Sequence, residues 1–175
     1  MLKIISLIVV ALVAAVLIFA ATKPDTFRVE RSIVIKAPPE KVFALVNNFH
    51  QWAEWSPWEH LDPAMVRTYG GAAEGKGAVY GWTGDSKVGE GRMEITESSP
   101  STRIGIKLDF LKPFEAHNTT EYTLVAQGDS TTVTWVMAGP NVFMGKLMQV
   151  FVNMDNMVGK DFETGLANLK AVAER

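Results

Sequence analysis

Two clusters of ionisable side chains near residue 50 have spacings suited to acid–base or metal chemistry. His50 and Glu54 are four residues apart, so on a helix they would share one face and could form an acid–base pair. Glu59, His60 and Asp62 carry two carboxylates and an imidazole, which are common metal ligands. Neither cluster belongs to a metal or catalytic motif such as HExxH. We therefore expect both clusters to be solvated polar positions.

A third histidine and a glycine-rich loop are further candidates. His117 lies among Glu115, Asn118 and Glu121, but no nucleophile elbow or converging set of Asp and His residues accompanies it. The loop GGAAEGKG at residues 70–77 lacks the Gly-Lys-Ser/Thr ending of a phosphate-binding loop and leads into a strand. We expect no catalytic residue, no metal and no cofactor at these positions.

A charged row lies on one predicted strand. Glu90, Arg92 and Glu94 alternate in sequence and therefore share one face of that strand. This face either forms the exterior of the sheet or, with the opposite parity, reaches the interior. The sequence leaves both possibilities open.

Composition excludes several classes of function. The chain has 175 residues, a length that favours one domain with an appendage, and 47% of its residues are hydrophobic. The formal net charge is −2 without a long basic run, which argues against a nucleic-acid partner because such binding depends on Lys and Arg neutralising phosphates. The absence of cysteine excludes disulfides, thiol nucleophiles and thiolate metal sites.

The N-terminus is predicted to be a membrane anchor. A tail at residues 1–3 precedes residues 4–22, which contain no charged side chain, and a short polar linker follows at residues 23–26. As a helix, residues 4–22 would reach roughly 28 Å, close to the hydrocarbon thickness of a bilayer. We therefore expect a single-pass helix that holds the domain at residues 27–175 on the cell membrane. Positive charges flank both ends of the helix, so the positive-inside rule leaves the side of the domain undetermined.

A cleaved signal peptide is the alternative for this segment. Its apolar region would normally span about 7–15 residues, which is shorter than the run seen here. Cleavage needs small residues at −3 and −1, but the pairs Ile18/Ala20 and Phe19/Ala21 place a bulky side chain at −3. The pair Ala20/Thr22 is only tolerable. An uncleaved anchor is therefore favoured.

The remainder of the chain predicts an α+β domain. Residues 27–37 alternate between apolar and polar side chains, as expected for a half-buried strand, and two short helices follow before residue 65. Six alternating stretches between residues 65 and 138 are separated by short turns, which join antiparallel neighbours. Residues 143–169 have apolar side chains at helical spacing and would cover the apolar face of the sheet. Because this run is long, we expect a break near Asn153-Met154.

The order of these elements and several motifs resemble the helix-grip fold of the START-like (SRPBCC) superfamily. The motifs are APPEKVFALVNN, WAEWSPW, YGWTGD, VGEGRMEITE, TTEYTLV, STTVTWVMAG and MVGKDFETGLANLK. Within the superfamily, the chain resembles the polyketide cyclase/dehydrase and lipid-transport group. The resemblance implies a curved antiparallel sheet of about seven strands around a long C-terminal helix. It also implies a hydrophobic cavity between sheet and helix that holds a lipid, sterol, polyketide or other apolar small molecule.

Trp52, Trp55 and Trp58 are three residues apart. Together on the surface they would form an apolar patch of roughly 450–750 Å², at or beyond what a soluble monomer usually exposes. We expect them to be mainly buried, with Trp55 and Trp58 in the core or the cavity wall. Trp52 is expected to be the most exposed to solvent or membrane.

Strand parity and helical spacing select further residues for the cavity wall, each of which could also be an ordinary core residue. Together with Trp55 and Trp58, the candidates are Tyr69, Trp82, Phe110, Tyr122, Trp135 and Met137 on strands and Phe143, Leu147, Phe151 and Met154 on the long helix.

Three functions are compatible with this sequence. The first is a membrane-anchored module that binds an apolar small molecule or lipid, which it would meet at the bilayer. The second is a cofactor-free, cyclase-like enzyme, because polyketide cyclases can act chiefly by shaping their substrate. The third is a co-chaperone-like interaction module with a collapsed cavity. We favour the first.

Overall fold

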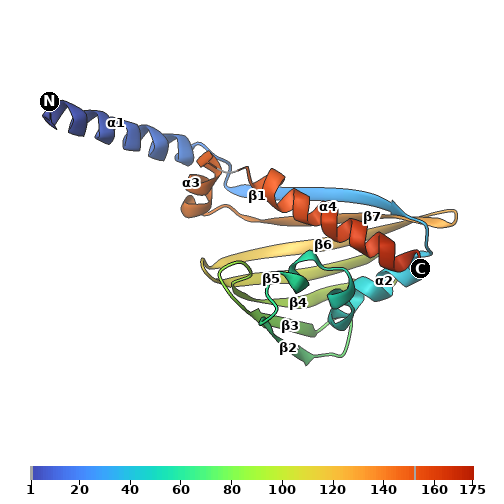
Figure 1. The fold of residues 1–175 in the computed structure, drawn as a ribbon. Coiled ribbons are helices and arrows are strands. Elements are labelled where there is room, and N and C mark those ends of the chain that lie inside the picture. The colour runs from blue at the N-terminus through green and yellow to red at the C-terminus, as the bar shows by residue number, and fades with distance from the viewer. Residues whose placement is uncertain (1, 152) are drawn as a thin grey trace.

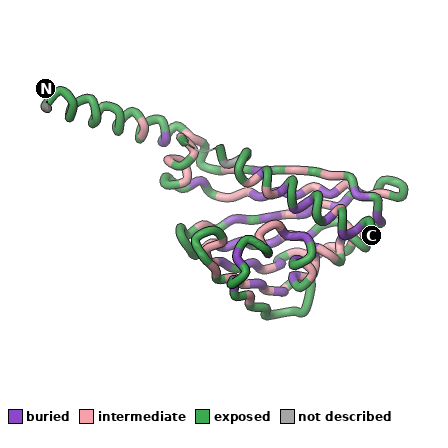
Figure 2. Tube along the Cα trace, in the orientation of Figure 1, coloured by how far each residue is buried: buried purple, intermediate pink, exposed green. Residues whose placement is uncertain are grey.

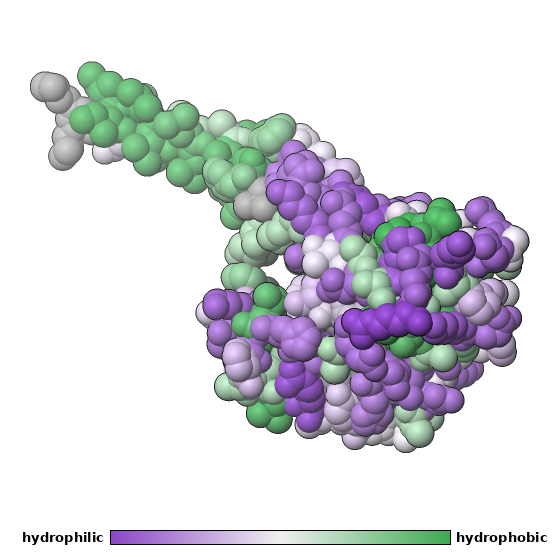
Figure 3. All heavy atoms as spheres, turned by 45° about the vertical axis from the view of Figure 1, so that its right-hand side comes forward, coloured by the Kyte–Doolittle hydropathy of each residue, from purple (hydrophilic) through white to green (hydrophobic). Residues whose placement is uncertain are grey.

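The computed structural model describes residues 2–151 and 153–175, without the side chains of Leu2 and Met154. Helix α1 (Leu2–Ala21) extends away from an α+β domain (Figure 1). On the face shown in Figure 3, the surface of α1 is almost entirely apolar, whereas the domain surface is mostly polar. Helix α1 is long and apolar enough to cross a membrane, and a signal sequence would have the same properties.

Seven antiparallel strands form one sheet in the order β1-β7-β6-β5-β4-β3-β2. Strands β2 to β7 follow one another through short connections, while β1 pairs with β7 along its whole length, from Thr26 opposite Pro140 to Ile35 opposite Thr131. Irregular register between β4 and β5 interrupts the ladder at two points, and such bulges bend a sheet. The strands are β1 (Thr26–Ile35), β2 (Val66–Gly71), β3 (Ala78–Thr83), β4 (Glu90–Ser99), β5 (Arg103–Lys112), β6 (Ala116–Gln127) and β7 (Ser130–Pro140).

Helix α4 (Met154–Ala173) covers the inner face of the sheet and lies along β1. Phe162, Leu166 and Leu169 on this helix are buried, and purple buried residues recur along the strands in Figure 2. The predicted helix-grip fold is therefore confirmed.

Three short helices close one side of the sheet: α2 (Pro39–Asn47) and the 3₁₀ helices η1 (Phe49–Glu54) and η2 (Pro57–His60). The indole N–H of Trp52 donates to the carbonyl of Val46 at 2.9 Å, and that of Trp55 donates to the carbonyl of Leu45 at 3.1 Å. Carbonyls in the last turn of a helix lack partners within the helix. Both rings are thereby fixed beneath α2. The expectation that Trp52 would be exposed was wrong, because only 3% of its surface is accessible.

The predicted break of the C-terminal helix is confirmed. Helix α3 (Phe143–Phe151) ends before Asn153, whose side chain caps α4 by accepting from the Asn156 amide at 3.1 Å. Helix α3 packs against α1, so the part of the C-terminal run that lies across the sheet is α4.

Candidate functional site

A cavity of about 210 Å³ lies between the sheet, the 3₁₀ helices and the first half of α4. It exceeds the roughly 150 Å³ that suffices for benzene in an apolar core and is smaller than the roughly 300–1,000 Å³ of common ligand pockets. Most of its wall is aromatic or aliphatic. The lining residues are Trp52, Ser56, Trp58, Glu59, Met65, Tyr80, Trp82, Lys87, Val88, Met93, Leu108, Phe110, Thr120, Trp135, Met137, Val158, Asp161 and Phe162.

Trp135 forms the centre of the aromatic wall. Its ring stacks on Phe162 of α4 with centroids 3.9 Å apart and on Tyr122 of β6 at 4.9 Å. Trp58 meets Trp135 edge-on at 5.7 Å. The Trp135 indole N–H donates to Thr120 Oγ1 at 2.8 Å, so its polar atom is satisfied within the wall. These ring contacts and the hydrogen bond to Thr120 hold the Trp135 ring in one orientation in the wall.

Glycines allow two of the rings to lie against backbone. A Cβ at Gly91 on β4 would lie 2.3 Å from Cζ2 of Trp82, and one at Gly165 on α4 would lie 2.8 Å from Cζ3 of Trp135. Both distances are shorter than real side chains allow. These glycines therefore let a strand and a helix approach the cavity rings closely.

A buried carboxylate holds the opposite side of the cavity together. Glu59 is 5% exposed and accepts hydrogen bonds from Tyr80 Oη and Arg67 Nε, each at 2.6 Å. Arg67 also donates to the Glu59 carbonyl at 2.6 Å. Burial and the hydrogen bond to Glu59 raise the pKa of Tyr80 far above its usual range, so its hydroxyl stays protonated and donates. The bond to Glu59 also raises the pKa of Arg67.

Asp161 is a second acidic group on the wall. It is half-buried on α4, and burial raises the pKa of its carboxyl although a hydrogen bond from Trp58 opposes this shift. Asp161 lines a cavity whose wall is mostly apolar. Asp161 is therefore suited to accept a hydrogen bond from a ligand hydroxyl or amine.

The ionisable side chains of the two clusters near residue 50 do not converge on one reactive centre. The ring of His50 stacks on Tyr69 at 3.9 Å, and Glu54 is exposed. Glu59 and Asp62 are buried, so the expectation that both would be solvated was wrong, whereas His60 is exposed. Asp62 accepts from the amides of Ala64 and Asp85, each at 2.8 Å. Among the described residues, no group of three or more His, Cys, Asp and Glu could hold a metal ion.

His117 belongs to an ion-pair cluster away from the cavity. Its Nδ1 lies 2.7 Å from Asp109 Oδ1, and this hydrogen bond raises the pKa of His117. Burial alone would raise the pKa of Asp109, but hydrogen bonds from His117 and Lys107 outweigh it and lower that pKa.

The charged row on β4 also lies outside the cavity wall. Arg92 pairs with Glu94 at 2.8 Å, and Lys112 pairs with Glu90 at 2.7 Å. Of the two possible faces for this row, the structure therefore shows the exterior.

The structure gathers some predicted wall residues and separates others. Trp58, Trp82, Phe110, Trp135 and Met137 line the cavity. Trp55 and Tyr122 are fully buried behind that wall. Tyr69 is 42% exposed because β2 is an edge strand.

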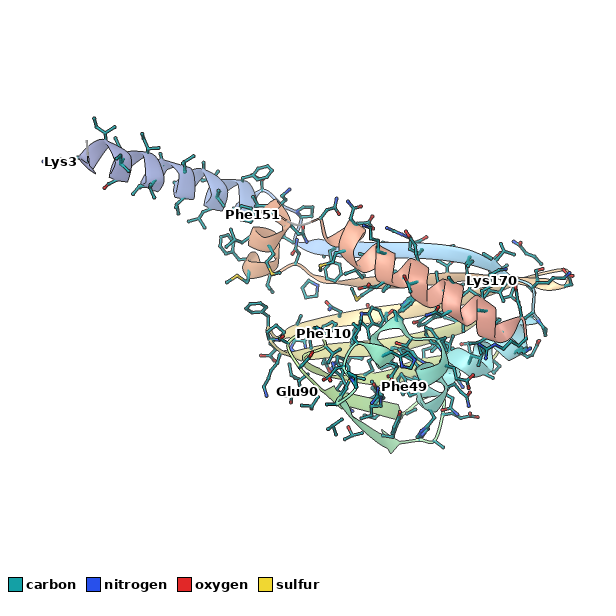
Figure 4. The ribbon with its side chains drawn as sticks, viewed as in Figure 1. Lys3, Phe49, Glu90, Phe110, Phe151 and Lys170 are labelled. Carbon is teal, nitrogen blue, oxygen red and sulfur yellow. The ribbon has the colours of Figure 1, made fainter. Side chains whose placement is uncertain are left out.

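Helix α3 does not contribute to the wall as expected. Phe143, Leu147 and Phe151 lie on α3, which leaves the sheet and packs beside α1, and Phe151 lies near the end of α1 in Figure 4. Phe143 and Phe151 are exposed, and Leu147 is half-buried. The side chain of Met154 lies outside the described part of the chain.

Several wall residues were missed although register could have found them. Leu108 precedes Phe110 by two residues, and Tyr80 precedes Trp82 by two, so each pair shares a strand face. Met93 lies opposite both Tyr80 and Leu108. Val158 and Phe162 are four apart on α4, a spacing that places them on one side of a helix.

Solved structures with this fold were found at low sequence identity. A protein from Chromobacterium violaceum superposes with a TM-score of 0.60 at 18% identity, covering 87% of this chain and 99% of its own. The di-domain ARO/CYC BexL gives a TM-score of 0.64 at 17% identity, covering 90% of this chain and 53% of its own. The Aha1 dimer from Colwellia psychrerythraea gives 0.56 at 16% identity, covering 85% and 96%. At these identities the likeness shows the fold alone.

The sequence itself identifies the family. No significant match was found among curated proteins. Residues 26–174 match the family described as polyketide cyclase/dehydrase and lipid transport, which spans nearly all of the chain beyond α1. With the helix-grip sheet and its apolar cavity, the chain belongs to the polyketide cyclase/dehydrase and lipid transport family.

Proposed function

We propose that this protein binds one apolar small molecule, or an apolar part of a lipid, in the cavity between its sheet and α4. The observation that carries the proposal is a cavity of about 210 Å³ walled mainly by aromatic and methionine side chains. Protein interiors are close-packed, so a mostly apolar cavity of this size in the core is suited to hold an apolar molecule. Methionine adapts to ligands of irregular shape, and Met93 and Met137 both lie on the wall.

We further propose that α1 is an uncleaved anchor in the cell membrane. Its length and apolar surface support a single span, and its sequence has poor cleavage sites. A membrane-anchored domain meets apolar ligands where they are most concentrated. Under this proposal, binding occurs at the bilayer.

The binding proposal is tested by filling the cavity. Val158 lines the cavity and is half-buried, so Val158→Trp would place an indole in the available space. The neighbouring Met157 is exposed and does not line the cavity, so Met157→Trp adds the same ring to the same helix as a matched control. Each full-length protein is purified from membranes in one detergent, and its co-purified lipids are extracted and quantified by mass spectrometry.

The expected result is one lipid or apolar metabolite enriched to near one equivalent in the native protein and in Met157→Trp. The Val158→Trp variant should lose most of it. A native protein that carries only bulk lipid in bulk proportions would overturn the proposal, as would full retention by a folded Val158→Trp variant.

A cofactor-free, cyclase-like activity is a second candidate, favoured by Asp161. A carboxyl with a raised pKa in an apolar cavity is a common form of general acid or base. BexL, one of the superposed structures, is described as an ARO/CYC protein. Under this proposal Asp161 would exchange a proton with the bound substrate.

The environment of Asp161 gives a pH-dependent prediction. Burial raises the pKa of Asp161 in the folded protein above its unfolded value near 3.8. The contribution of Asp161 to folding stability is therefore full at pH values below 3.8, and it is lost as the pH rises through the folded pKa. Asp161→Asn cannot ionise, so it avoids this loss of stability at higher pH, and its amide oxygen can still accept the hydrogen bond from Trp58. The variant should therefore gain stability relative to the native protein between acidic and neutral pH, measured by denaturant unfolding at each pH. A difference independent of pH would contradict the prediction.

A further inference from the structure

Building on α1 as a membrane span, we infer that α3 and the β5–β6 turn form a second membrane contact, and that the cavity opens toward it. We use the name anchor-end surface for the exposed apolar residues of these two elements. They are Val142, Phe143, Met144, Met148 and Phe151 on or beside α3, and Leu111 and Phe114 at the β5–β6 turn. The occupant assigned to this surface is the lipid bilayer.

The register of the sheet brings these elements to one end. Thr26 lies opposite Pro140, so α1 and α3 join the sheet at the same place. Phe110 lies opposite Ala116 and Glu90 lies opposite Lys112, which puts the β5–β6 and β3–β4 turns at that end as well. In Figure 1, α1, α3 and these turns are all on the left of the domain.

The anchor-end surface is more apolar than a soluble domain requires. Phe151 is 73% exposed and Phe114 is 59% exposed, although large rings are usually buried. They belong to elements that are far apart in the sequence. Figure 3 shows apolar atoms continuing from α1 onto the adjoining helix. Exposed large apolar side chains gathered at one end of a domain mark a membrane or protein contact.

Continuity with α1 favours the bilayer as the occupant. Asn141 donates from its backbone to the Asp25 carbonyl at 2.7 Å and from its side chain to the Pro24 carbonyl at 2.9 Å, and Lys146 pairs with Asp25. These bonds fix the start of α3 to the segment that leaves α1. Lys23 lies over the Phe19 ring at 4.4 Å, with its charge at the end of the apolar run, as at a membrane–water boundary. A helix held beside this point lies at the depth of the interface.

The cavity reaches the same end of the domain. Its wall includes Lys87 and Val88 in the β3–β4 turn, Phe110 near the β5–β6 turn and Val158 near the start of α4. Lys87 is exposed, so the cavity meets solvent or lipid here. Under this inference an apolar molecule passes from the bilayer into the cavity at this end of the domain. The ligand class that this geometry selects is one dissolved in the membrane.

The charges near the anchor-end surface do not favour anionic lipid. Lys87 and Lys112 are accompanied by Asp85, Glu90 and Glu115 on the same turns. Burial of apolar side chains is the remaining source of affinity. We therefore expect the contact to form on neutral phosphatidylcholine and to be insensitive to salt.

The test uses the absence of native cysteine, which lets one introduced thiol carry an environment-sensitive fluorophore. Full-length Phe114→Cys and Met148→Cys report the anchor-end surface, and Leu12→Cys reports α1. Val125→Cys is the matched control, because Val125 is 51% exposed near the β6–β7 turn, at the opposite end of the sheet. Each labelled protein is reconstituted in phosphatidylcholine vesicles, and quenching by doxyl-labelled lipid is measured.

We expect the labels at 12, 114 and 148 to lose most of their emission to lipid quencher and the label at 125 to lose none. Quenching at 12 without quenching at 114 and 148 would overturn the second contact and leave the anchor intact. No quenching at 12 would instead refute the proposed anchor and, with it, this inference. The labels at 114 and 148 could instead be shielded from the lipid quencher until the protein is diluted with more lipid. That result would show that a second copy of the chain covers this surface, and it would overturn the bilayer as occupant.

Discussion

Trp135→Ala is expected to lower the free energy of unfolding by about 3–5 kcal/mol, the usual range for truncating a buried large aromatic side chain. The ring is 2% exposed and stacks on Phe162 and Tyr122. Removing it would merge a new void with the existing cavity, so the neighbouring rings would lose packing on two sides. The measurement is guanidinium unfolding of the full-length protein in detergent, followed by near-ultraviolet circular dichroism.

Two further variants serve as controls for the loss of stability expected in Trp135→Ala. Val125→Ala truncates an exposed apolar side chain on the neighbouring strand and should change stability by less than about 0.5 kcal/mol. Trp135→Phe keeps a ring but removes the N–H that donates to Thr120, so a smaller loss of about 1 kcal/mol is expected. A loss below about 1 kcal/mol for Trp135→Ala would show that this ring does not support the core as a truncated buried aromatic should.

The fold could be predicted from the sequence because its signals are local and repeated. Alternation along each strand and short turns between residues 65 and 138 allow little besides an antiparallel meander. The break at Asn153 was also predictable, since a long apolar run without a stop exceeds a normal globular helix. What the pattern did not contain was the destination of α3. Apolar side chains at helical spacing look the same whether they face a sheet, another helix or lipid.

The site was harder to predict because its polar partners are distant in the sequence. Trp52 is buried because its indole N–H reaches the Val46 carbonyl in the last turn of α2, which a spacing of three residues does not indicate. Glu59 is buried because Arg67 and Tyr80 arrive from two different strands. Gly165 looks like a weakness in a helix, where glycine is worse than alanine by about 1 kcal/mol. In the structure it is the position where α4 approaches Trp135.

Glu59→Ala is the second substitution with a large expected effect, about 1–3 kcal/mol lost from the free energy of unfolding, as for leaving the buried Tyr80 hydroxyl without its acceptor. Truncation would leave the Arg67 guanidinium and the buried Tyr80 hydroxyl without their shared acceptor. Because Glu59 and Tyr80 both line the cavity, the same change should loosen the wall that holds the ligand. The measurement is again guanidinium unfolding of the full-length protein, with co-purified lipid quantified in parallel.

Glu59→Gln separates the hydrogen bonds from the charge. Its amide oxygen can still accept a hydrogen bond from Tyr80 or Arg67. If hydrogen bonding dominates, Glu59→Gln should lose less stability than Glu59→Ala. If the charge dominates, the two variants should lose equal amounts. Glu54→Ala, five residues earlier and exposed, is the matched control and should be nearly neutral. Equal, small losses for Glu59→Ala and Glu54→Ala would mean that the carboxylate does not hold η2 to the sheet. The polar side of the cavity would then owe its shape to packing alone.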